Sequence, residues 1–175
     1  MPEAGDAAIA DARLRALFGY WRERRGDRAM PARADLDPLE IPTLLPIVVL
    51  VDVLDGGARF RYRLVGTEIV DVDGHDPTGR FLDEVLPDSG YADYMIGLFR
   101  EVTRERRPLY GECDFRGPGH IERRVRRLLM PLSCDGRAVD MIFGGQVAVA
   151  SGRGAQSPGS EGAGPFNEIV RVLLE

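Results

Sequence analysis

Lysine is absent from this sequence, and all 23 of its basic residues are arginine. Arginine differs from lysine in binding carboxylates and phosphates through two parallel hydrogen bonds. However, alanine, glycine, proline and aspartate are also abundant, and together these residue types are typical of proteins encoded by a GC-rich genome. Coding bias is the simpler explanation, so the absence of lysine by itself assigns no function.

Cysteine and histidine are scarce, with two residues of each. Cys113 and Cys134 form neither a CxxC motif nor a disulfide framework, so we expect two free thiols in a reducing compartment. His75 and His120 lie in predicted turns, and neither has a serine or cysteine nucleophile at the spacing of a catalytic motif. Because no catalytic set is recognisable, we expect that the protein is not an enzyme.

Long apolar segments are also missing. The longest run, Leu44–Val51, is too short to span a bilayer, and the first residues lack the cationic and apolar segments of a signal peptide. The net charge of −5 argues against a nucleic-acid-binding protein, which would carry a basic surface. These absences predict a cytoplasmic protein that binds neither membranes nor nucleic acids.

Acidic residues are frequent but dispersed, and one group resembles the start of a calcium site. Asp71, Asp73 and Asp76 alternate along a predicted loop, but the spacing and the terminal glutamate of an EF-hand are missing. A solvated acidic loop explains these residues, and we predict no metal site.

The chain length of 175 residues suits one domain with flanking segments. Helical spacing of apolar residues near the N-terminus and a stretch rich in glycine, serine and proline near the C-terminus set the expected boundaries. The predicted parts are an N-terminal amphipathic helix in 1–30, a core in 31–150, a flexible linker in 151–165 and a short C-terminal helix in 166–175.

Within the core, two strands rich in β-branched and aromatic residues precede a helical section, and three strands follow it. Turn sequences such as Asp55-Gly56-Gly57 separate the strands, and residues 91–102 have the clearest helical periodicity. The predicted strands are 47–54, 59–65, 109–116, 121–132 and 138–149. This order predicts an α+β fold with a five-stranded antiparallel sheet.

A set of short motifs runs through residues 12–150. The most specific is Phe60-Arg61-Tyr62-Arg63-Leu64-Val65-Gly66-Thr67. The others are Tyr20-Trp21, Pro31-x-Arg33, Asp37-Pro38, Leu44-Leu45-Pro46, Asp52, Gly74-x-Asp76-x-Thr78-Gly79, Pro131-Leu132 and Asp135-Gly136. Together they resemble the bacterial PAS-5 family of PAS domains. The resemblance implies strand order 2-1-5-4-3, short helices over one face of the sheet, and a sensory or regulatory role, and it carries over no cofactor or catalytic residue.

A ligand pocket, as the resemblance implies, would lie between the second strand and the long helix. Phe60, Tyr62 and Leu64 alternate along that strand, so we expect all three to face the helix. The candidate pocket residues are Tyr62, Leu64, Thr67, Tyr94, Met95, Leu98, Phe99, Met141 and Phe143. Arg63 is the candidate anchor for an anionic group. The same residues also fit a packed core that binds nothing.

Haem and flavin are cofactors of some PAS domains, and each requires a particular residue. His75 is the better candidate for a haem ligand because it follows the first helical turns, yet its glycine and aspartate neighbours indicate an exposed loop. The flavin-binding relatives carry a cysteine after the second strand, and Gly66–Leu86 contains none. Cys113 lies in a predicted strand and faces the same way as Leu109 and Phe115, so we predict a buried structural thiol. We expect no required cofactor.

Four arginines fall within residues 123–127 of one predicted strand, and the alternation of side chains places two on each face of the sheet. No aromatic residue separates them, as a sheet that binds RNA would require. Pairing with Glu112 and Asp114 of the neighbouring strand is the expected arrangement. An arginine on the concave face would instead be an anchor for a carboxylate or phosphate ligand.

The N-terminal helix carries an apolar stripe of Leu14, Leu17, Phe18 and Trp21. Such a stripe must pack on the chain's own sheet or on a second copy, and PAS relatives commonly dimerise through this helix. We therefore predict a homodimer with these four residues as interface candidates. The apolar stripe in 166–175 poses the same choice between its own domain and a partner.

Two functions of different classes remain open. In the first, a small molecule or a redox state shifts the structure of a sensory domain and alters a dimer contact or its contact with a regulatory partner protein in trans. In the second, the protein is a ligand-free adaptor whose terminal segments bind partners. A haem-binding sensor is a further alternative that depends on His75.

Overall fold

The computed structural model describes residues 7–86, 89–116, 122–150 and 166–175. His120 and the linker predicted in 151–165 lie outside the described residues. The helices are α2 (Ala12–Arg25), α3 (Thr67–Asp73), α4 (Leu82–Val85) and α5 (Ser89–Glu105), with short 3-10 turns η1 (Arg33–Asp35), η2 (Pro38–Glu40) and η3 (Leu45–Ile47). Among the described residues, no helix combines the length and apolarity needed to cross a membrane.

The strands form one antiparallel sheet in the order β2-β1-β5-β4-β3-β6. Their bounds are β1 (Val48–Leu54), β2 (Arg59–Val65), β3 (Leu109–Arg116), β4 (Glu122–Leu132), β5 (Met141–Ala150) and β6 (Phe166–Leu173). The α+β class, the five predicted strands and the order 2-1-5-4-3 are confirmed. The sixth strand was not expected.

The helix predicted in 166–175 was wrong, because the chain forms β6 there and pairs antiparallel with β3. Ile169, Val170 and Val172 favour a strand, and β3 offers an edge with unpaired backbone groups. The apolar residues at 166, 170, 173 and 174 fit the spacing of a helix. In the structure, Phe166 and Leu173 pack in the cluster on one face of the sheet, and Val170 and Leu174 pack in the cluster on the other. The segment therefore packs on its own domain.

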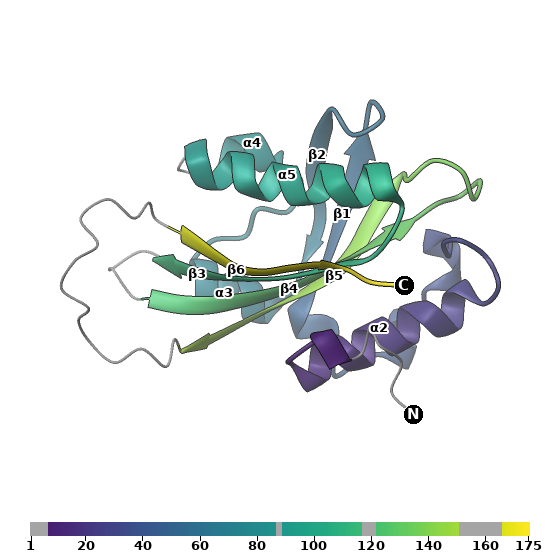
Figure 1. Ribbon diagram of the computed structural model, residues 1–175, viewed down its shortest axis with the longest axis horizontal. Helices are drawn as coiled ribbons and strands as arrows, with labels where there is room; N and C mark the ends of the chain where they lie inside the picture. Colours follow the sequence, from purple (N-terminus) through teal and green to yellow (C-terminus); the bar gives the residue numbers. More distant parts are fainter. Residues whose placement is uncertain (1–6, 87–88, 117–121, 151–165) are drawn as a thin grey trace.

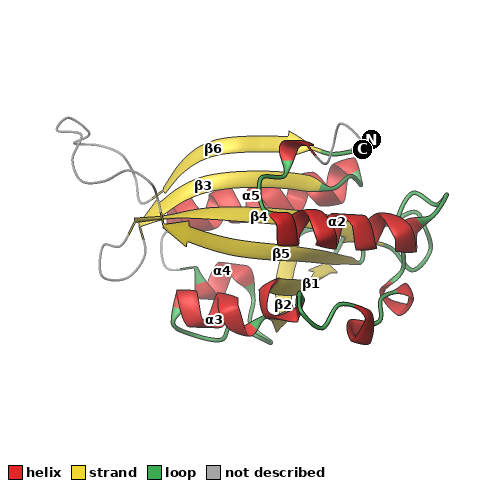
Figure 2. Cartoon of the chain, turned by 90° about the horizontal axis from the view of Figure 1, so that it is seen from below, coloured by secondary structure: helices red, strands yellow, loops and turns green. Residues whose placement is uncertain are grey.

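The sheet separates two apolar clusters, each covered by different helices (Figures 1 and 2). Helix α5 lies along one face of β3, β4 and β6, with α3 and α4 near the ends of the strands. Helix α2 lies on the opposite face, against β4 and β5. We call these the α5 face and the α2 face of the sheet.

Helix α2 is bound tightly to the sheet by the stripe that the sequence offered as a dimer contact. Asp11 caps its first turn by accepting hydrogen bonds from the amides of Arg13 and Leu14 at 2.8 and 3.2 Å. The candidate interface residues Leu14, Leu17, Phe18 and Trp21 are all fully buried within the single chain. Trp21 donates its indole N–H to the Pro131 carbonyl at 3.0 Å.

A glycine in β5 explains how α2 approaches so closely. A Cβ atom on Gly145 would lie 2.7 Å from a methyl group of Leu14 and 2.8 Å from one of Leu17. The apolar stripe of α2 therefore contacts its own sheet and is not available as the interface of the homodimer that was predicted from it.

Candidate functional site

A cavity of about 300 Å³ lies between the α5 face of the sheet and helices α3, α4 and α5. Strands β2, β3, β4 and β5 form its floor, and the two loops after α3 and α4 complete the wall. Most of its lining is apolar or aromatic, with Tyr62 and Tyr91 adding hydroxyl groups. The purely apolar side chains are Val72, Pro77, Val85, Leu86, Met95, Phe115 and Val125.

Arg127 is the central polar group of this cavity and is only 5% exposed. Its Nε donates to the Gln146 amide oxygen at 2.8 Å, one terminal nitrogen donates to the Cys113 sulfur at 3.2 Å, and the other donates to the Tyr91 hydroxyl. All three acceptors are neutral groups. Within the described part of the chain, no carboxylate forms an ion pair with Arg127.

Strand pairing places Arg127 in this position. Side chains alternate along β4, so Arg123, Val125 and Arg127 all face α5. The register sets Arg127 opposite Gly111 of β3 and Gln146 of β5. Gln146 can therefore hold the guanidinium from the next strand.

Three further ionisable groups line the solvent-exposed side of the cavity. Arg123 donates to the Val72 carbonyl at 2.9 Å, and His75 Nδ1 lies 3.2 Å from the Asp73 carbonyl. Asp73 is exposed on one side, but burial of its carboxyl group on the cavity side raises its pKa above the ordinary value. Electrostatic interactions, of which that with Arg127 is the largest, lower it by less.

The tyrosines around the cavity are neutral at physiological pH. Burial raises the pKa of Tyr91 to about 12, and it raises the pKa of Tyr62 and of Tyr94 as well. These hydroxyl groups can therefore donate or accept hydrogen bonds, but they add no charge that would neutralise Arg127.

Only some of the predicted pocket residues reach this cavity. Tyr62 and Met95 line it, and Phe99 joins them in an adjacent void of about 30 Å³ that also touches Arg127 and Gln146. Leu98 is buried in the same apolar cluster but lines neither space. Tyr94 instead stacks on Phe166 of β6, with ring centroids 4.7 Å apart.

Four other candidates lie on the α2 face, so their assignment to this pocket was wrong. A bulge in β2 pairs Val51 with Tyr62 and Leu50 with Leu64, so Arg63 is an extra residue and Leu64 points away from Tyr62. The alternation of β5 likewise turns Met141 and Phe143 toward α2. Thr67, at the start of α3, lines a groove on that side.

The predicted anion anchor, Arg63, is also misplaced. Its side chain is 59% exposed and lies 3.7 Å from the Asp52 carboxylate, which also receives two hydrogen bonds from Arg61. Arg127 occupies the buried position that Arg63 was expected to hold. The alternation of the arginine run indicated that two of the four would face α5, but the sequence does not reveal which pair lacks acidic partners.

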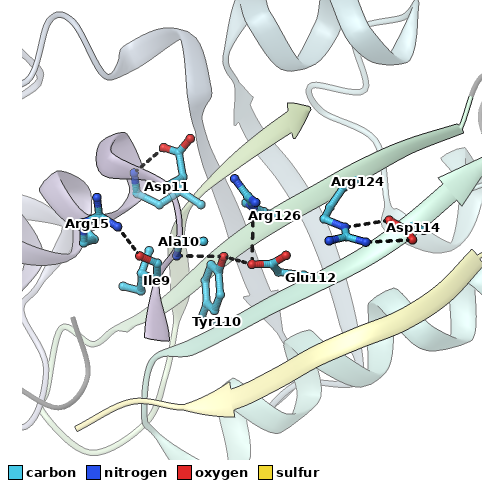
Figure 3. Close-up of polar contacts among 10 residues, drawn as sticks. Ile9, Ala10, Asp11, Arg15, Tyr110, Glu112, Asp114, Arg124 and Arg126 are labelled. Carbon is cyan, nitrogen blue, oxygen red and sulfur yellow. Dashed lines mark hydrogen bonds and ion pairs between the residues drawn. The ribbon is translucent and has the colours of Figure 1, made fainter. Parts of the chain in front are cut away.

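The arginines on the α2 face have such partners, as the sequence predicted (Figure 3). Arg124 donates two hydrogen bonds to Asp114, at 2.9 and 3.2 Å, and Arg126 lies 3.4 Å from Glu112. Glu112 also accepts a hydrogen bond from the Tyr110 hydroxyl at 2.5 Å.

This network extends to the N-terminal segment. The Tyr110 hydroxyl accepts the Ala10 amide at 3.2 Å, and Arg15 donates to the Ile9 carbonyl at 2.5 Å (Figure 3). Ile9 itself is fully buried. The charges on this face are therefore paired, and they help to fix the segment before α2.

A second concave region, of about 380 Å³, lies on the α2 face beside the three 3-10 turns. It is lined mainly by apolar residues, including Leu36, Ile41, Leu50 and Phe143, with Leu64 41% exposed at its side. It has no buried charged group comparable to Arg127. We call it the apolar groove.

The other candidate groups do not assemble into a reactive site. His75 is exposed rather than set in an apolar wall, which is not the setting of a proximal haem ligand. Cys113 is a fully buried free thiol in the cluster that contains Leu109 and Phe115, as predicted, and Cys134 is an exposed free thiol. Within the described ranges, no group of three metal-binding side chains comes together.

Comparison with known proteins now identifies the fold. A family model described as a PAS domain, PAS_5, matches residues 9–147. The chain belongs to the PAS-5 family of PAS domains. This family membership places it among sensory signalling domains, whereas the comparison with curated proteins gives no match.

Two solved structures are similar to this chain. The PAS domain from Bordetella pertussis BvgS has a TM-score of 0.51 and 21% sequence identity, over 67% of this chain and 90% of that chain. A LOV protein from Rhodobacter sphaeroides has a TM-score of 0.48 and 14% identity, over 67% and 70% of the two chains. At these identities the similarity shows the fold alone.

Proposed function

We propose that this PAS domain is a sensor that binds a small molecule between its sheet and α5 and transmits the bound state to a partner protein. The cavity around Arg127 is the observation that carries the proposal. Small-molecule sites combine an apolar lining with a few convergent polar groups, and this cavity has both. Its volume of about 300 Å³ suits a ligand smaller than a typical drug.

The position of the cavity supports transmission as well as binding. Arg127 and Cys113 lie on the α5 face, and their chain neighbours Arg126 and Glu112 lie on the α2 face. A ligand that shifts β3 and β4 therefore acts on both faces of the sheet. The apolar groove and the exposed Leu64 then offer a surface on which a partner can detect the change.

We also propose that the protein is not an enzyme. Cys113 accepts a hydrogen bond from Arg127, and His75 lies against a backbone carbonyl, so the described residues contain no thiol–imidazole pair at this site. The remaining polar groups suit binding and orientation.

A ligand-free adaptor is the competing function, and the apolar groove favours it. In that case a partner protein would bind the groove, and the Arg127 cavity would be only a packing defect. The two functions make different predictions for the purified chain: a sensor would carry a bound small molecule, and an adaptor would not.

Native mass spectrometry of the purified full chain, followed by metabolite extraction, tests the proposal. We expect the wild-type chain to carry a small molecule at partial or full occupancy. The variant Val125→Phe fills the cavity from β4 and should therefore lack this molecule. Leu64→Phe, at the apolar groove, is the matched control and should retain it. Wild-type protein that carries no small molecule, and that no compound in a metabolite library stabilises against heat, would overturn the proposal in favour of the adaptor.

A further inference from the structure

We propose that the ligand of the Arg127 cavity is a small carboxylic acid with an apolar or aromatic body, bound as its anion with the carboxylate on Arg127. This inference rests on the proposed function, because it names the chemical class of the molecule that the cavity binds. It starts from the charge of Arg127 and from what surrounds that charge.

An arginine side chain stays protonated in a protein, so Arg127 brings a full positive charge into the interior. A buried charge is strongly destabilising unless an opposite charge or a complete set of hydrogen bonds compensates for it. Here the described partners are an amide oxygen, a thiol and a phenol, which are all neutral. The guanidinium has five N–H groups, and these partners use three of them.

The acid that lines the same cavity, Asp73, attracts this charge but does not pair with it. Asp73 forms no ion pair with Arg127 in the described structure, and it lies on the solvent-exposed side. The second arginine, Arg123, adds further positive charge and already donates to the Val72 carbonyl. The inner end of the cavity is therefore electropositive and has hydrogen-bond donors to spare.

The geometry of a guanidinium favours a planar carboxylate. Two N–H groups of arginine match the two oxygens of a carboxylate in a bidentate pair, and such charge-assisted bonds are roughly twice as strong as neutral ones. A carboxylate brings one negative charge, which matches the single buried guanidinium of Arg127. Arg123 lies on the solvent-exposed side of the cavity, where its charge is more strongly screened. We therefore expect a monoanionic group.

The rest of the lining describes the body of the ligand. Met95, Phe115, Val125 and Leu86 present only apolar surface, and Tyr91 stacks on Phe115 with ring centroids 4.5 Å apart. Sugars and other polar bodies would leave their hydroxyl groups without partners against these side chains. An aliphatic chain or an aromatic ring fits the same surface and gains from its burial.

Isothermal titration calorimetry of the wild-type full chain against matched pairs of acids and amides tests the charge directly. The probes are benzoate, phenylacetate, 3-phenylpropionate, hexanoate and octanoate, each with its primary amide, and phenyl phosphate. We expect at least one carboxylate to bind with a Kd below about 1 mM. We expect it to bind at least about tenfold more tightly than its amide, and more tightly than phenyl phosphate.

Two variants test whether the preference for the carboxylate depends on the α5 face. Arg127→Gln should abolish the preference for the carboxylate over the amide, whereas Arg126→Gln, one residue away on the α2 face, should retain it. If Arg127→Gln does not fold, the comparison of acid and amide on the wild-type chain still decides the question.

The failure of this inference is distinguishable from the failure of the proposed function. Amides that bind as tightly as their acids, or a neutral co-purified molecule, would overturn the carboxylate while leaving a small-molecule sensor in place. Preference for phenyl phosphate would replace the carboxylate with a phosphate. If none of the carboxylates binds, the inference is overturned, and the co-purification experiment then shows whether the sensor is overturned with it.

Discussion

Arg126 and Arg127 are neighbours in β4, yet they have different environments. Arg126 faces α2, 3.4 Å from the buried carboxylate of Glu112, in a network that reaches the N-terminal segment (Figure 3). Arg127 faces α5 and is surrounded by neutral acceptors and the cavity. One strand therefore presents a neutralised charge on one face and an unneutralised charge on the other.

The difference separates the structural role of Arg126 from the binding role that we propose for Arg127. On the α2 face, acids from β3 match the arginines of β4 one for one, and the fully buried stripe of α2 covers the cluster beside them. On the α5 face, β3 places Gly111 opposite Arg127 and Phe115 opposite Arg123, so neither arginine has an acid across from it. The same residue type is part of the packed structure in one case and available to a ligand in the other.

Replacing Trp21 by glutamate should have the largest effect, because it disrupts the packed α2 face. Loss of a large buried aromatic side chain costs about 3–5 kcal/mol, and the introduced carboxylate would be buried without a partner. We expect the chain to lose its cooperative urea unfolding transition, monitored by circular dichroism. Leu39→Glu, at a residue 85% exposed, is the control and should unfold like wild type. A folded Trp21→Glu chain that changes only its oligomeric state would show that α2 binds a second copy.

The paired variants Arg126→Met and Arg127→Met compare the two faces directly. Arg126→Met leaves Glu112 buried and without its cation, and it should lower the free energy of unfolding by about 2–3 kcal/mol. Arg127→Met removes a buried charge that has only neutral partners, so its effect should be within about 1 kcal/mol of zero. Urea denaturation of both variants measures the difference. Equal destabilisation would mean that the charge of Arg127 is neutralised by the fold itself.

A smaller change should follow from Glu112→Gln. The amide oxygen can still accept the Tyr110 hydroxyl, but the charge opposite Arg126 is lost, so we expect a destabilisation of about 1 kcal/mol. Glu68→Gln breaks a comparable pair with Arg13 whose side chains are 40% and 39% exposed, and it should cost less than about 0.5 kcal/mol. If chemical denaturation shows the same loss of stability for the two variants, the charge of the buried Glu112 contributes no more to stability than that of the partly exposed Glu68.

The smallest effect concerns Asp73. Burial raises its pKa in the folded chain, so the folded state favours the neutral carboxyl, and stability falls as the pH rises from the unfolded value of about 3.9 through the folded one. Asp73→Asn should therefore stabilise the chain at neutral pH, by less than about 1 kcal/mol because the residue is partly exposed. Thermal unfolding of wild type and variant, measured as a function of pH, checks this, and the gain should vanish below about pH 4.

Asp76 provides a control of opposite sign. Its hydrogen bonds from Thr78 lower its pKa, so its contribution to stability is present at neutral pH and is lost as the pH falls. Asp76→Asn should therefore be slightly destabilising at neutral pH in the same thermal unfolding series. If Asp73→Asn and Asp76→Asn change the stability at neutral pH in the same direction, the opposite pKa shifts of the two carboxyl groups would be contradicted.

Much of the fold was predictable because its signals are local. The runs of β-branched residues bounded by glycine turns gave the five strands, and the helical spacing of Leu14, Leu17 and Trp21 gave α2. The short motifs around Phe60–Thr67 gave the family and, with it, the strand order. Each of these signals depends on residues close together in the chain.

The errors arose where distant segments decide the outcome. The bulge at Arg63 moved Leu64 to the opposite face, and the free edge of β3 turned the expected C-terminal helix into β6. Arg127 is the arginine without an acidic partner because the register with β3 and β5 gives it Gly111 and Gln146 as neighbours. No pattern within β4 itself distinguishes it from Arg126.

Nuclear magnetic resonance of the guanidinium N–H groups tests the central claim most directly. The signals of Arg126 and Arg127 would be assigned in the wild-type chain from the two methionine variants, and the chain would then be titrated with the tightest-binding carboxylate. We predict that the Arg127 signals shift as the new hydrogen bonds form and that the Arg126 signals stay in place. A carboxylate that binds without moving the Arg127 signals, or that moves those of Arg126 instead, would contradict the account.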